Sequence, residues 1–529
     1  MNIAFITFLI VWSLGVIQRS LYQLYLWQVK EYRWDRMHAF LKTGPGKQFF
    51  LDKLTGLKLA FFLIGLVAIN YLGLYYLALF IPYVLHLILL LSRRSKVKKP
   101  DFTKKALLIY SLTFLSLAAP TSLILFTPNL NIKILSLLGL DLLLPAIIPL
   151  AILVQWPLGT YLKNKTFKRA AEKRAKHKKL TVIGITGSYG KSSVKEFLAT
   201  LLKEKFKVLK TPQNVNSEMG IANFILAKLK KNHQVLVAEM GAYKKGEIKK
   251  SCEIVRPQIG ILTAINEQHL DLFGGLENTK KAKYELISSL PHNGFAVFNG
   301  DNEHTFKMAL KTQVPHVLYS VKDKAHVWAS DIKATLDYLR FVLNYKDKKE
   351  LIEVKLTGKH NVSNLLAAIT VSLHLGLDME ELRRGLSKLE PLERTLRPII
   401  GREGVLIIDD SYSANPDGVI AALEYLKENF TDKQKVILMP SLIELGREAR
   451  AIHAKLGSKL AEIGDQVIIT TADYYKEILQ GVERESYPKF RLIMKSKEIK
   501  QHLKGFLDKD TVVLLESRVP GEVIKYLKY

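Results

Sequence analysis

The segment at residues 181–202, TVIGITGSYGKSSVKEFLATLL, constrains the fold of this chain more than any other. Its first residues form a β-branched apolar run that predicts a buried strand, and the pattern from Ser192 onward predicts a helix. The turn between them holds Gly187, Gly190 and Lys191. A strand, a glycine-rich turn and a helix N-terminus together point backbone N–H groups at an anion, and the lysine extends this cradle. The segment therefore predicts a phosphate-binding loop.

The polar residues of this loop predict contacts to a nucleotide. The hydroxyl of Ser192, directly after the lysine, is in the position that binds Mg²⁺ in such loops. Ile185 stands where the common eight-position pattern has its first glycine, so the match is incomplete. A plain glycine turn is the alternative, but we expect ATP to bind here. The expected contacts are Gly187, Ser188, Gly190, Lys191, Ser192 and Ser193.

Charge and cysteine content restrict the partners and the compartment. The 529 residues carry a net charge of +29, which by itself would suit a nucleic-acid partner. The basic residues crowd beside apolar segments, however, and the sequence has no basic–aromatic arrangement for base stacking. This pattern favours an anionic membrane face and argues against nucleic acid. The single cysteine, Cys252, excludes an intramolecular disulfide and suits a reducing compartment.

The first third of the chain is strongly apolar and predicts a helical membrane domain. The stretch 57–92 would form a single helix of about 54 Å, far longer than a hydrocarbon core of about 30 Å. Asn70 and Gly73 offer a turn within it, so we interpret it as two spans. The other expected spans are 2–17, 106–126 and 134–158, the last of them interrupted by Pro145 and Pro149. The domain 1–162 is therefore predicted to hold about five transmembrane helices.

Loop charge predicts the orientation of this domain. A strongly basic loop lies between the third and fourth spans, and residues 19–53 are also basic on balance. Under the positive-inside rule these loops lie in the cytoplasm. With five spans, everything after residue 162 lies in the cytoplasm too, where ATP is available. We therefore expect a multi-pass protein of the cell membrane with cytoplasmic catalytic domains.

Two polar features accompany the apolar segments. Asp141 lies inside the last one, where a carboxylate indicates a functional site. We prefer a plainer interpretation, in which Asp141 lies near a membrane surface or caps a broken helix. Residues 163–179 form a basic linker that we expect to be helical. The linker either binds anionic lipid or only spaces the membrane domain from the next domain.

Beyond residue 180 the pattern changes to alternating strands and helices. Buried-strand runs with helical patterns between them occur at 234–238, 258–263, 294–298 and 405–408. Such alternation predicts a mostly parallel sheet covered by helices, with the ligand at the carboxyl ends of the strands. Glu239 and His269 closely follow two of these strands. A carboxylate and an imidazole in these places are natural ligands for Mg²⁺.

Further sequence blocks accompany these residues in order. They read TGSYGKSS, TPQNVNSEMG, AEMGAYKKGEI, NEQHLDLFG, KKAKYELI, FNGDN, TGKHNVSNLLAA, DDSYSANPDG, IELG and ESRVPGE. Together the blocks resemble the Mur ligase family, the ATP-dependent amide-forming ligases of peptidoglycan precursors. The resemblance runs from about residue 180 to the C-terminus. It implies a central P-loop domain (180–393) with a parallel sheet and a Rossmann-like C-terminal domain (394–529), both α/β, behind the all-α membrane domain.

The resemblance also implies a reaction. ATP phosphorylates a substrate carboxylate, and an amine then attacks the acyl phosphate to give an amide. The implied substrates are a small-molecule or lipid-linked carboxylate and an amino acid or dipeptide, D-alanyl-D-alanine or a related amine. Lys191, His269 and Lys283 would be catalytic. Ser192, Glu239 and His269 would hold Mg²⁺. Lys283 is either carbamylated, as in several relatives, or an ordinary exposed lysine on a helix.

Other positions match the family's binding residues. By resemblance, the further nucleotide contacts are Asn299, Asn361, Arg394 and Asp410. Spacing does not separate Arg394 from Arg397, which lies in the same segment. The residues expected on the substrate side are Asn214, Asn216, Tyr412, Asn415, Ser517 and Arg518.

The chain also departs from the family pattern. Pro440 and Ser441 stand where relatives usually have a glycine-acid pair, and Leu515 and Glu516 replace a lysine-glycine pair. Both changes fall in segments that select the amine. Membrane spans occupy the place of the usual N-terminal substrate domain. A synthetase of a poly-amino-acid such as polyglutamate, and a nucleotide-gated membrane or scaffolding protein, are therefore alternatives to an envelope ligase.

Overall fold

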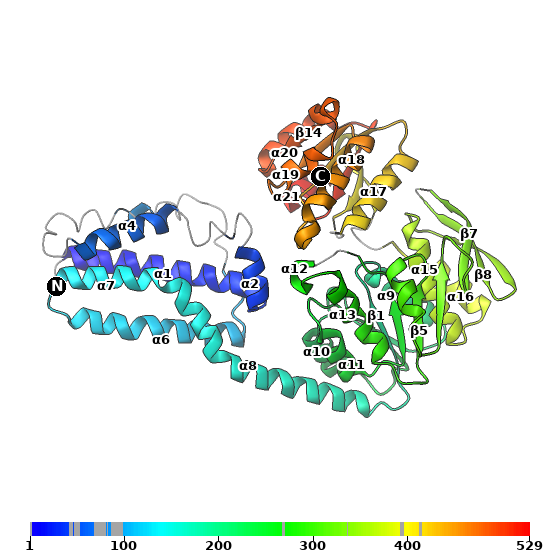
Figure 1. The fold of residues 1–529 in the computed structure, drawn as a ribbon, viewed down its shortest axis with the longest axis horizontal. Coiled ribbons are helices and arrows are strands. Elements are labelled where there is room, and N and C mark those ends of the chain that lie inside the picture. Colours follow the sequence, from blue (N-terminus) through cyan, green and yellow to red (C-terminus); the bar gives the residue numbers. More distant parts are fainter. Residues whose placement is uncertain are drawn as a thin grey trace. The chain divides into compact units, whose positions relative to one another are not determined.

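A computed structural model describes most of the chain (Figure 1). The described residues are 3–41, 46, 53–67, 81, 83–85, 99–266, 270–335, 337–391, 396–411 and 415–528. The chain divides into two compact units, residues 1–164 and 165–529. The described part of the first unit is helical, and the second unit holds two separate β-sheets with helices on their faces. This arrangement confirms the predicted fold class.

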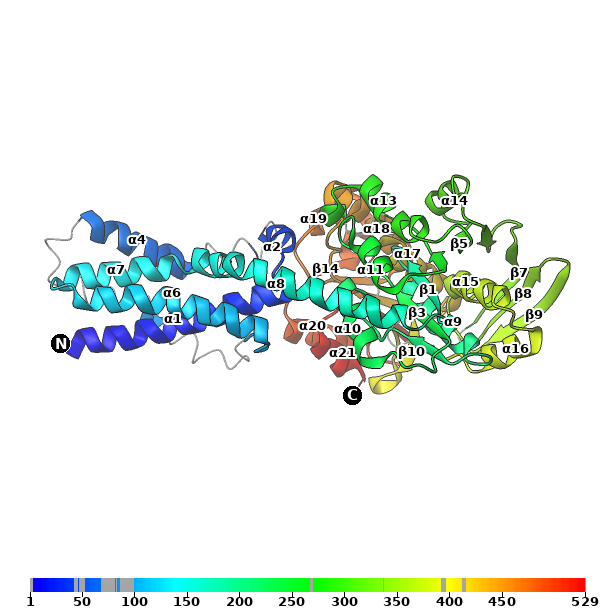
Figure 2. The same cartoon turned by 90° about the horizontal axis from the view of Figure 1, so that it is seen from below.

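The first unit is built from apolar helices. They are α1 (Ile3–Val29), α2 (Trp34–Leu41), α4 (Lys53–Val67), α6 (Lys104–Phe126), α7 (Leu130–Leu142) and the beginning of α8 (Leu144–Ala175). Helices α1, α6 and α7 lie side by side (Figure 2). Their buried faces, with Phe8, Trp12 and Leu137 among them, form one apolar core. Within the described residues, α1, α6 and α8 are long and apolar enough to cross a membrane.

These helices agree only in part with the five predicted spans. The span at 106–126 is confirmed by α6, and the first span is the beginning of the longer α1. Much of the predicted pair at 57–92 lies outside the described residues. The predicted interruption of the span at 134–158 is confirmed near Pro145, because the chain breaks at Leu143 between α7 and α8. Proline has no N–H to donate and suits the first turn of a helix, which is where Pro145 lies in α8. The second predicted interruption is wrong, because Pro149 lies inside α8.

Asp141 lies in the core of the first unit. Its carboxylate is fully buried and accepts hydrogen bonds from Arg19 Nη1 at 2.7 Å, Lys58 Nζ at 2.7 Å and Tyr83 Oη at 2.9 Å. These partners come from α1, α4 and residue 83, which are distant in sequence. The place of Asp141 near a membrane surface stays a prediction. The alternative capping role is wrong, because the side chain caps no described helix. It is instead the centre of a buried ion-pair network.

The basic linker is helical, as predicted. Helix α8 runs without interruption from the apolar segment through to Ala175. In the second unit, Phe167 and Ala170 of this helix are buried against the core of the first sheet. The end of the linker is therefore packed onto the domain that comes next in the chain.

The first sheet of the second unit has nine strands in the order β2-β3-β1-β4-β5-β6-β7-β8-β9. They are β1 (Thr181–Thr186), β2 (Val208–Lys210), β3 (Val235–Glu239), β4 (Ile259–Leu262), β5 (Phe295–Asn299), β6 (His316–Ser320), β7 (Val327–Ala334), β8 (Leu339–Tyr345) and β9 (Lys348–Val354). Pairing is parallel from β2 to β7 and antiparallel from β7 to β9. The predicted parallel core is confirmed, and the antiparallel extension was not predicted.

Helices cover both faces of this sheet (Figure 1). One face packs against α9 (Lys191–Leu202), α15 (His360–His374) and α16 (Met379–Ser387). The other face packs against α10 (Glu218–Lys228), α11 (Glu247–Val255) and α13 (Leu276–Ser288). The short helices α12 (Leu270–Phe273) and α14 (Glu303–Ala309) complete the domain. Cys252 of α11 is buried, and burial raises the pKa of its thiol to about 12, which suits a non-reactive core residue.

The second sheet has six strands in the order β10-β11-β15-β12-β13-β14. They are β10 (Arg397–Ile400), β11 (Leu406–Asp410), β12 (Gln434–Met439), β13 (Gln466–Ile469), β14 (Phe490–Leu492) and β15 (Thr511–Glu516). Only β10 is antiparallel to its neighbour. The helices α17 (Pro416–Asn429), α18 (Ala449–Ile463) and α19 (Tyr475–Gln480) cover one face, and α20 (Ser496–Leu503) and α21 (Gly521–Lys528) cover the other. This parallel sheet between helices is the Rossmann-like layout that the sequence predicts.

Candidate active site

The predicted phosphate loop leaves the carboxyl end of β1 and enters α9. Gly187 has φ 151° and Gly190 has φ 77°, conformations that side chains rarely adopt. A Cβ at Gly187 would collide with the hydroxyl of Thr263, and a Cβ at Gly190 would lie 2.5 Å from Asn364 Oδ1. Both glycines are therefore required by the path of the chain. The loop ends at the N-terminus of α9, where Lys191, Ser192 and Ser193 form the first turn.

Lys191 folds back over the loop. Its Nζ donates hydrogen bonds to the carbonyl oxygens of Gly187 at 2.7 Å and Ser188 at 3.0 Å. Burial lowers the pKa of this amine, and the nearby charge of Glu239 opposes the shift. The ammonium group thus lies directly above the backbone that would cradle a phosphate, and it can exchange these carbonyls for phosphate oxygens.

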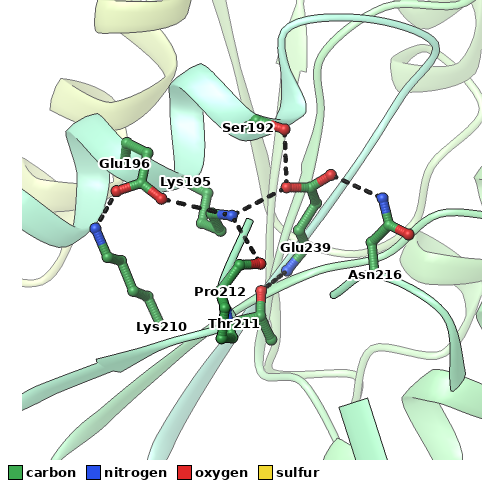
Figure 3. A network of polar contacts seen from close by, with 8 residues as sticks. All are labelled: Ser192, Lys195, Glu196, Lys210, Thr211, Pro212, Asn216 and Glu239. Atoms are coloured by element: carbon green, nitrogen blue, oxygen red, sulfur yellow. Dashed lines mark hydrogen bonds and ion pairs between the residues drawn. The ribbon is translucent and has the colours of Figure 1, made fainter. Parts of the chain in front are cut away.

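Glu239, at the end of β3, is the centre of a polar network beside the loop (Figure 3). Its carboxylate accepts hydrogen bonds from Ser192 Oγ at 3.0 Å, Lys195 Nζ at 3.2 Å and Asn216 Nδ2 at 3.0 Å. Its backbone N–H donates to Thr211 Oγ1 at 3.1 Å. The structure therefore brings together three predicted site residues, Ser192, Asn216 and Glu239, from three separate segments.

The network is negatively charged at its centre and surrounded by cations. Burial opposes ionisation of Glu239, but the charges of Lys191 and Lys195 outweigh it and lower the pKa of the carboxyl. The buried Lys195 was not predicted as a site residue. Its spacing of four residues from Lys191 places both on one face of α9, and this spacing could have revealed it.

The donor set around Glu239 fits Mg²⁺. This ion prefers hard oxygen ligands and commonly binds one or two protein oxygens together with substrate phosphates. The Ser192 hydroxyl and the Glu239 carboxylate supply such oxygens next to the phosphate loop. In the part of the chain that the structure describes, no group of three or more His, Cys, Asp or Glu residues could hold a metal by itself. His269, the third predicted ligand, lies outside the described residues.

Lys283 of α13 lies in a small cleft beside the loop. The cleft, of about 60 Å³, is lined by Ser188, Lys191, Asn216, Gly241, Ala242, Tyr243, Phe273 and Lys283. Lys283 is only 3% exposed, so its interpretation as an exposed helix lysine is wrong. Burial, together with the charge of Lys191, lowers the pKa of its amine to about 7. The amine is therefore partly neutral at neutral pH, which is the form that reacts with carbon dioxide.

Two further predicted nucleotide contacts are buried at the edges of the loop. Asn361 donates from Nδ2 to the Thr357 carbonyl and accepts from Asn364, whose Oδ1 lies over Gly190. This contact brings the start of α15 to the phosphate loop. Asn299, at the end of β5, accepts from the backbone N–H of Asp301 at 2.9 Å.

The C-terminal domain carries a pair of buried carboxyl groups. Asp410 and Glu516 lie opposite each other at the ends of the neighbouring strands β11 and β15. Burial raises the pKa of both groups. The charge of Asp410 adds to the rise at Glu516, and the charge of Asp409 adds to the rise at Asp410. Leu396 donates its N–H to Asp410 at 3.3 Å, and Ser517 has φ 61° directly after Glu516. We infer that this pair retains a proton in the native state near neutral pH.

Asn266 connects the phosphate loop to the C-terminal domain. Its backbone N–H donates to Ser188 Oγ at 3.1 Å, and its Nδ2 donates to Asp417 Oδ2 at 2.9 Å and Asn415 Oδ1 at 3.4 Å. Asn415 also caps α17 through Gly418. Asn266 was not predicted, although it comes after β4 in the same way that Glu239 comes at the end of β3.

The remaining predicted residues do not join this site in the described structure. Arg394 and Tyr412 lie outside the described residues, as does the side chain of Arg397. Asn214, with φ 63°, and Arg518 are both exposed.

Comparison with known proteins agrees with this geometry. The model of the Mur ligase middle domain matches residues 185–372, and the model of the Mur ligase glutamate ligase domain, the C-terminal one, matches residues 397–518. Together the matches cover more than half of the chain.

The chain belongs to the Mur ligase family.

Individual relatives show which members of the family the chain is similar to. This Mur ligase is 31% identical over 300 residues to the UDP-N-acetylmuramoyl-tripeptide–D-alanyl-D-alanine ligase of Escherichia coli, with 54% of this chain and 64% of that protein covered. It is 33% identical to the ligase of the same name from Mycobacterium tuberculosis, with 57% and 62% covered. The chain therefore spans just under two thirds of the length of these relatives.

Solved structures show the same likeness. The crystal structure of MurF from Acinetobacter baumannii superposes with a TM-score of 0.62 at 27% identity, covering 67% of this chain and 78% of that one. MurF from Thermotoga maritima, solved in complex with ADP, superposes with a TM-score of 0.61 at 27% identity, covering 69% and 83%.

The two departures of this Mur ligase from the family pattern are buried. Ser441 donates from its hydroxyl to the carbonyl of Asp473 and from its backbone to Thr471. Glu516 faces Asp410 inside the sheet. Both substitutions therefore change the interior of the C-terminal domain rather than an exposed surface.

Proposed function

We propose that this Mur ligase joins a carboxylate to an amine with ATP as the energy source. A carboxylate oxygen attacks the γ-phosphorus of ATP, and ADP leaves. The amine nitrogen then attacks the carbonyl carbon of the acyl phosphate, inorganic phosphate leaves, and the nitrogen loses a proton to give the amide. Each step moves negative charge among phosphate oxygens, so the protein must place positive groups around them.

One observation carries this proposal: two lysines and residues of the phosphate loop line one small cleft, beside the Ser192–Glu239 pair. Lys191 lies over the loop backbone, where it would meet the β- and γ-phosphates. Lys283 is buried and lines the same cleft, where it would meet the group being transferred. Two cations beside a buried carboxylate at a phosphate loop suit the transfer of a phosphoryl group better than nucleotide binding alone.

The chain's own residues would divide the work of the reaction among them. Backbone N–H groups of the loop and the Lys191 ammonium would hold the phosphates in line with the incoming carboxylate. Ser192 and Glu239 would hold Mg²⁺, which neutralises charge on the phosphates when bound. Lys195 would keep Glu239 ionised and fix its position. The Asn266 contacts to Asp417 and Asn415 would help close the C-terminal domain over the loop and exclude water.

The relatives suggest the substrate class. Their names specify a UDP-N-acetylmuramoyl-tripeptide and D-alanyl-D-alanine. We propose that the amine here is D-alanyl-D-alanine or a related dipeptide, and that the carboxylate ends a peptide of a cell-envelope precursor. The membrane helices at the front of this chain make a lipid-linked carboxylate a second candidate.

An ADP-release assay on the purified full-length protein tests the reaction. We expect release to require both a carboxylate and an amine, with UDP-N-acetylmuramoyl-tripeptide and D-alanyl-D-alanine as the first pair. Lys191→Ala should abolish this stimulated release. If no carboxylate–amine pair stimulated release, or if Lys191→Ala left it unchanged, the ligase proposal would fail.

We further propose that the first unit embeds in the cell membrane, with the ligase domains on the cytoplasmic side. Support comes from α1, α6 and α8, which are long and apolar enough to span, and from the basic loops beside them. The full-length protein should stay in the membrane fraction after carbonate extraction. Release into the soluble fraction without detergent would overturn this placement.

A further inference from the structure

A large basic groove lies along the outer strand of the first sheet, in the second unit. It has a volume of about 570 Å³ and runs beside β2, the C-terminal end of α9 and the C-terminal end of α10. The cations that line it include Lys203, Lys207, Lys228 and Lys230, and we call these four the groove lysines. None of the described residues that line the groove is acidic.

The groove lysines are not neutralised by the described part of the protein. Lys210, at one end, is paired with Glu196, but no carboxylate among the described residues forms an ion pair with any of the four groove lysines. The positive charge of the groove also acts on His233. Burial and the charges of Lys230 and Lys207 all lower the pKa of its imidazole. Four such cations around one hollow form a site for an anion.

The groove also has apolar lining residues. Val208, Leu209 and Phe224 line it and are partly buried. A ligand that fits has a phosphate for the lysines and a less polar portion for these residues. The headgroup region of a phospholipid has this composition.

The groove is separate from the ATP site. The strands β2, β3 and β1 are parallel, and the phosphate loop leaves the carboxyl end of β1. Lys207 directly precedes β2 and His233 lies just before β3, so they lie at the opposite, amino edge of the sheet. An anion in the groove would therefore be a second one, distinct from the phosphates held over Lys191.

The groove borders the helix that continues from the apolar segment. Lys173 of α8 donates from Nζ to the carbonyl of Leu226 in α10, two residues before Lys228. Phe167 and Ala170 of α8 are buried in the same core as α10. Helix α8 is continuous back to Leu144, so this basic edge of the domain adjoins the chain segment that enters the proposed membrane unit.

We propose that the groove binds the phosphate headgroups of anionic membrane lipids. The proposal rests on the proposed membrane placement, but not on the ligase reaction. It gives the ligase domains a contact with the membrane surface in addition to the covalent tether of α8.

Lysine footprinting on the full-length protein in lipid nanodiscs tests the proposal. The rate at which each lysine is acylated is measured by mass spectrometry in discs of phosphatidylcholine and in discs of an equal mixture with phosphatidylglycerol. Each groove lysine should react about fivefold more slowly in the anionic discs, as expected for a basic side chain at an anionic surface. The exposed Lys324, Lys348, Lys349 and Lys355 of the same domain are matched controls and should not change.

A charge-reversal variant and a soluble anion complete the test. With all four groove lysines changed to Glu, lipid-dependent protection of Lys210, which also lines the groove, should disappear, whereas the same change at the four control lysines should leave it intact. ADP release should be retained in both variants, which shows that they fold. Protection in the anionic discs supports the proposal. The proposal is overturned if free diphosphate protects the groove lysines and the anionic discs do not. It is also overturned if neither of them protects these lysines.

The experiment gives different results depending on whether the groove proposal or the membrane placement is wrong. A protein that enters the discs but shows no protected groove lysines contradicts the groove proposal only. A protein that does not enter the discs contradicts the membrane placement, on which the groove proposal depends.

Discussion

Two buried carboxylates, one in each unit, have similar surroundings and different roles. Asp141 in the first unit is fully buried, and Glu239 in the second is 2% exposed. Each accepts a hydrogen bond from a buried lysine, Lys58 in the first case and Lys195 in the second. Chemistry and burial alone therefore do not distinguish them.

Their other partners and their positions distinguish them. Asp141 also accepts from Arg19 and from the hydroxyl of Tyr83, so its charge is matched by two cations within a helical core. Glu239 accepts instead from a hydroxyl and an amide, at the carboxyl edge of a parallel sheet beside a cleft. Neutral donors can be exchanged for a metal ion at little cost, whereas cations in a dry core cannot. We therefore propose that Asp141 holds helices together and that Glu239 serves the proposed reaction.

The largest effect that tests this comparison is expected for a substitution of Asp141. Asp141→Asn should lower the free energy of unfolding of the first unit by about 3–5 kcal/mol, because Arg19 and Lys58 lose the charge that compensates them. Thermal unfolding in detergent measures this. Asp35→Asn, which removes the exposed partner of Arg33, is the control and should cost less than about 1 kcal/mol. Equal effects of the two substitutions would contradict a structural role for Asp141.

The next effect is expected at Glu239, and it is catalytic. Glu239→Gln keeps the shape of the side chain but removes the charge that would hold Mg²⁺, so stimulated ADP release should fall by about 10²–10³-fold. Glu253→Gln on the exposed face of α11 is the control and should leave the rate unchanged. If the rate of ADP release stayed within a few-fold of that of the unmodified protein, Glu239 would have a structural role, as Asp141 does.

A third buried site sharpens the comparison, because there two carboxyl groups face each other. The native pKa values of Asp410 and Glu516 are raised above their ordinary values of 3.8 and 4.5, so the folded state binds more protons than the unfolded state. Stability should therefore fall as pH rises above this range, by up to about 1.4 kcal/mol per pH unit for each proton involved. Glu516→Gln should flatten this dependence.

Unfolding measured at about pH 5 and about pH 8 tests this expectation. Glu522→Gln, an exposed position on α21, should keep the full pH dependence. If the unmodified chain were equally stable at both pH values, the pair would not retain a proton in the folded state near neutral pH.

The smallest of these effects concerns Lys283. Its amine has a pKa of about 7, so carbon dioxide can convert it to a carbamate near neutral pH. If this carbamate helps to hold a metal ion, removal of bicarbonate should lower ADP release by about tenfold above pH 7 and by less below pH 7, where the amine is protonated and forms little carbamate. Added bicarbonate should restore the rate. A rate that is insensitive to bicarbonate at every pH would identify Lys283 as an unmodified cation.

Much of the second unit could be predicted from the sequence, because its signals are local. The apolar run of β1, the two glycines and Lys191 form one continuous segment, and the strands β3, β4, β5 and β11 each appear as a short apolar run. The polar residue at the end of a parallel strand could be predicted as well, and Glu239 lies where this rule places it.

The features that could not be predicted depend on contacts between distant segments. Asp141 meets Arg19 and Lys58, which are 122 and 83 residues away in sequence, and no local pattern reveals this. The Asn266–Asp417 contact joins residues 151 apart. The interruption predicted at Pro149 was wrong for a different reason, since α8 continues through this proline although proline cannot donate a backbone hydrogen bond.

Metal binding tests the central distinction most directly. Mn²⁺, used as a paramagnetic substitute for Mg²⁺, is titrated with ATP into the full-length protein and into the Glu239→Gln and Asp141→Asn variants, and free Mn²⁺ is followed by electron paramagnetic resonance. The account predicts that Glu239→Gln weakens ATP-dependent Mn²⁺ binding by about tenfold or more, while Asp141→Asn leaves the affinity of the folded protein unchanged. Unchanged affinity in Glu239→Gln, or equal loss in both variants, would contradict it.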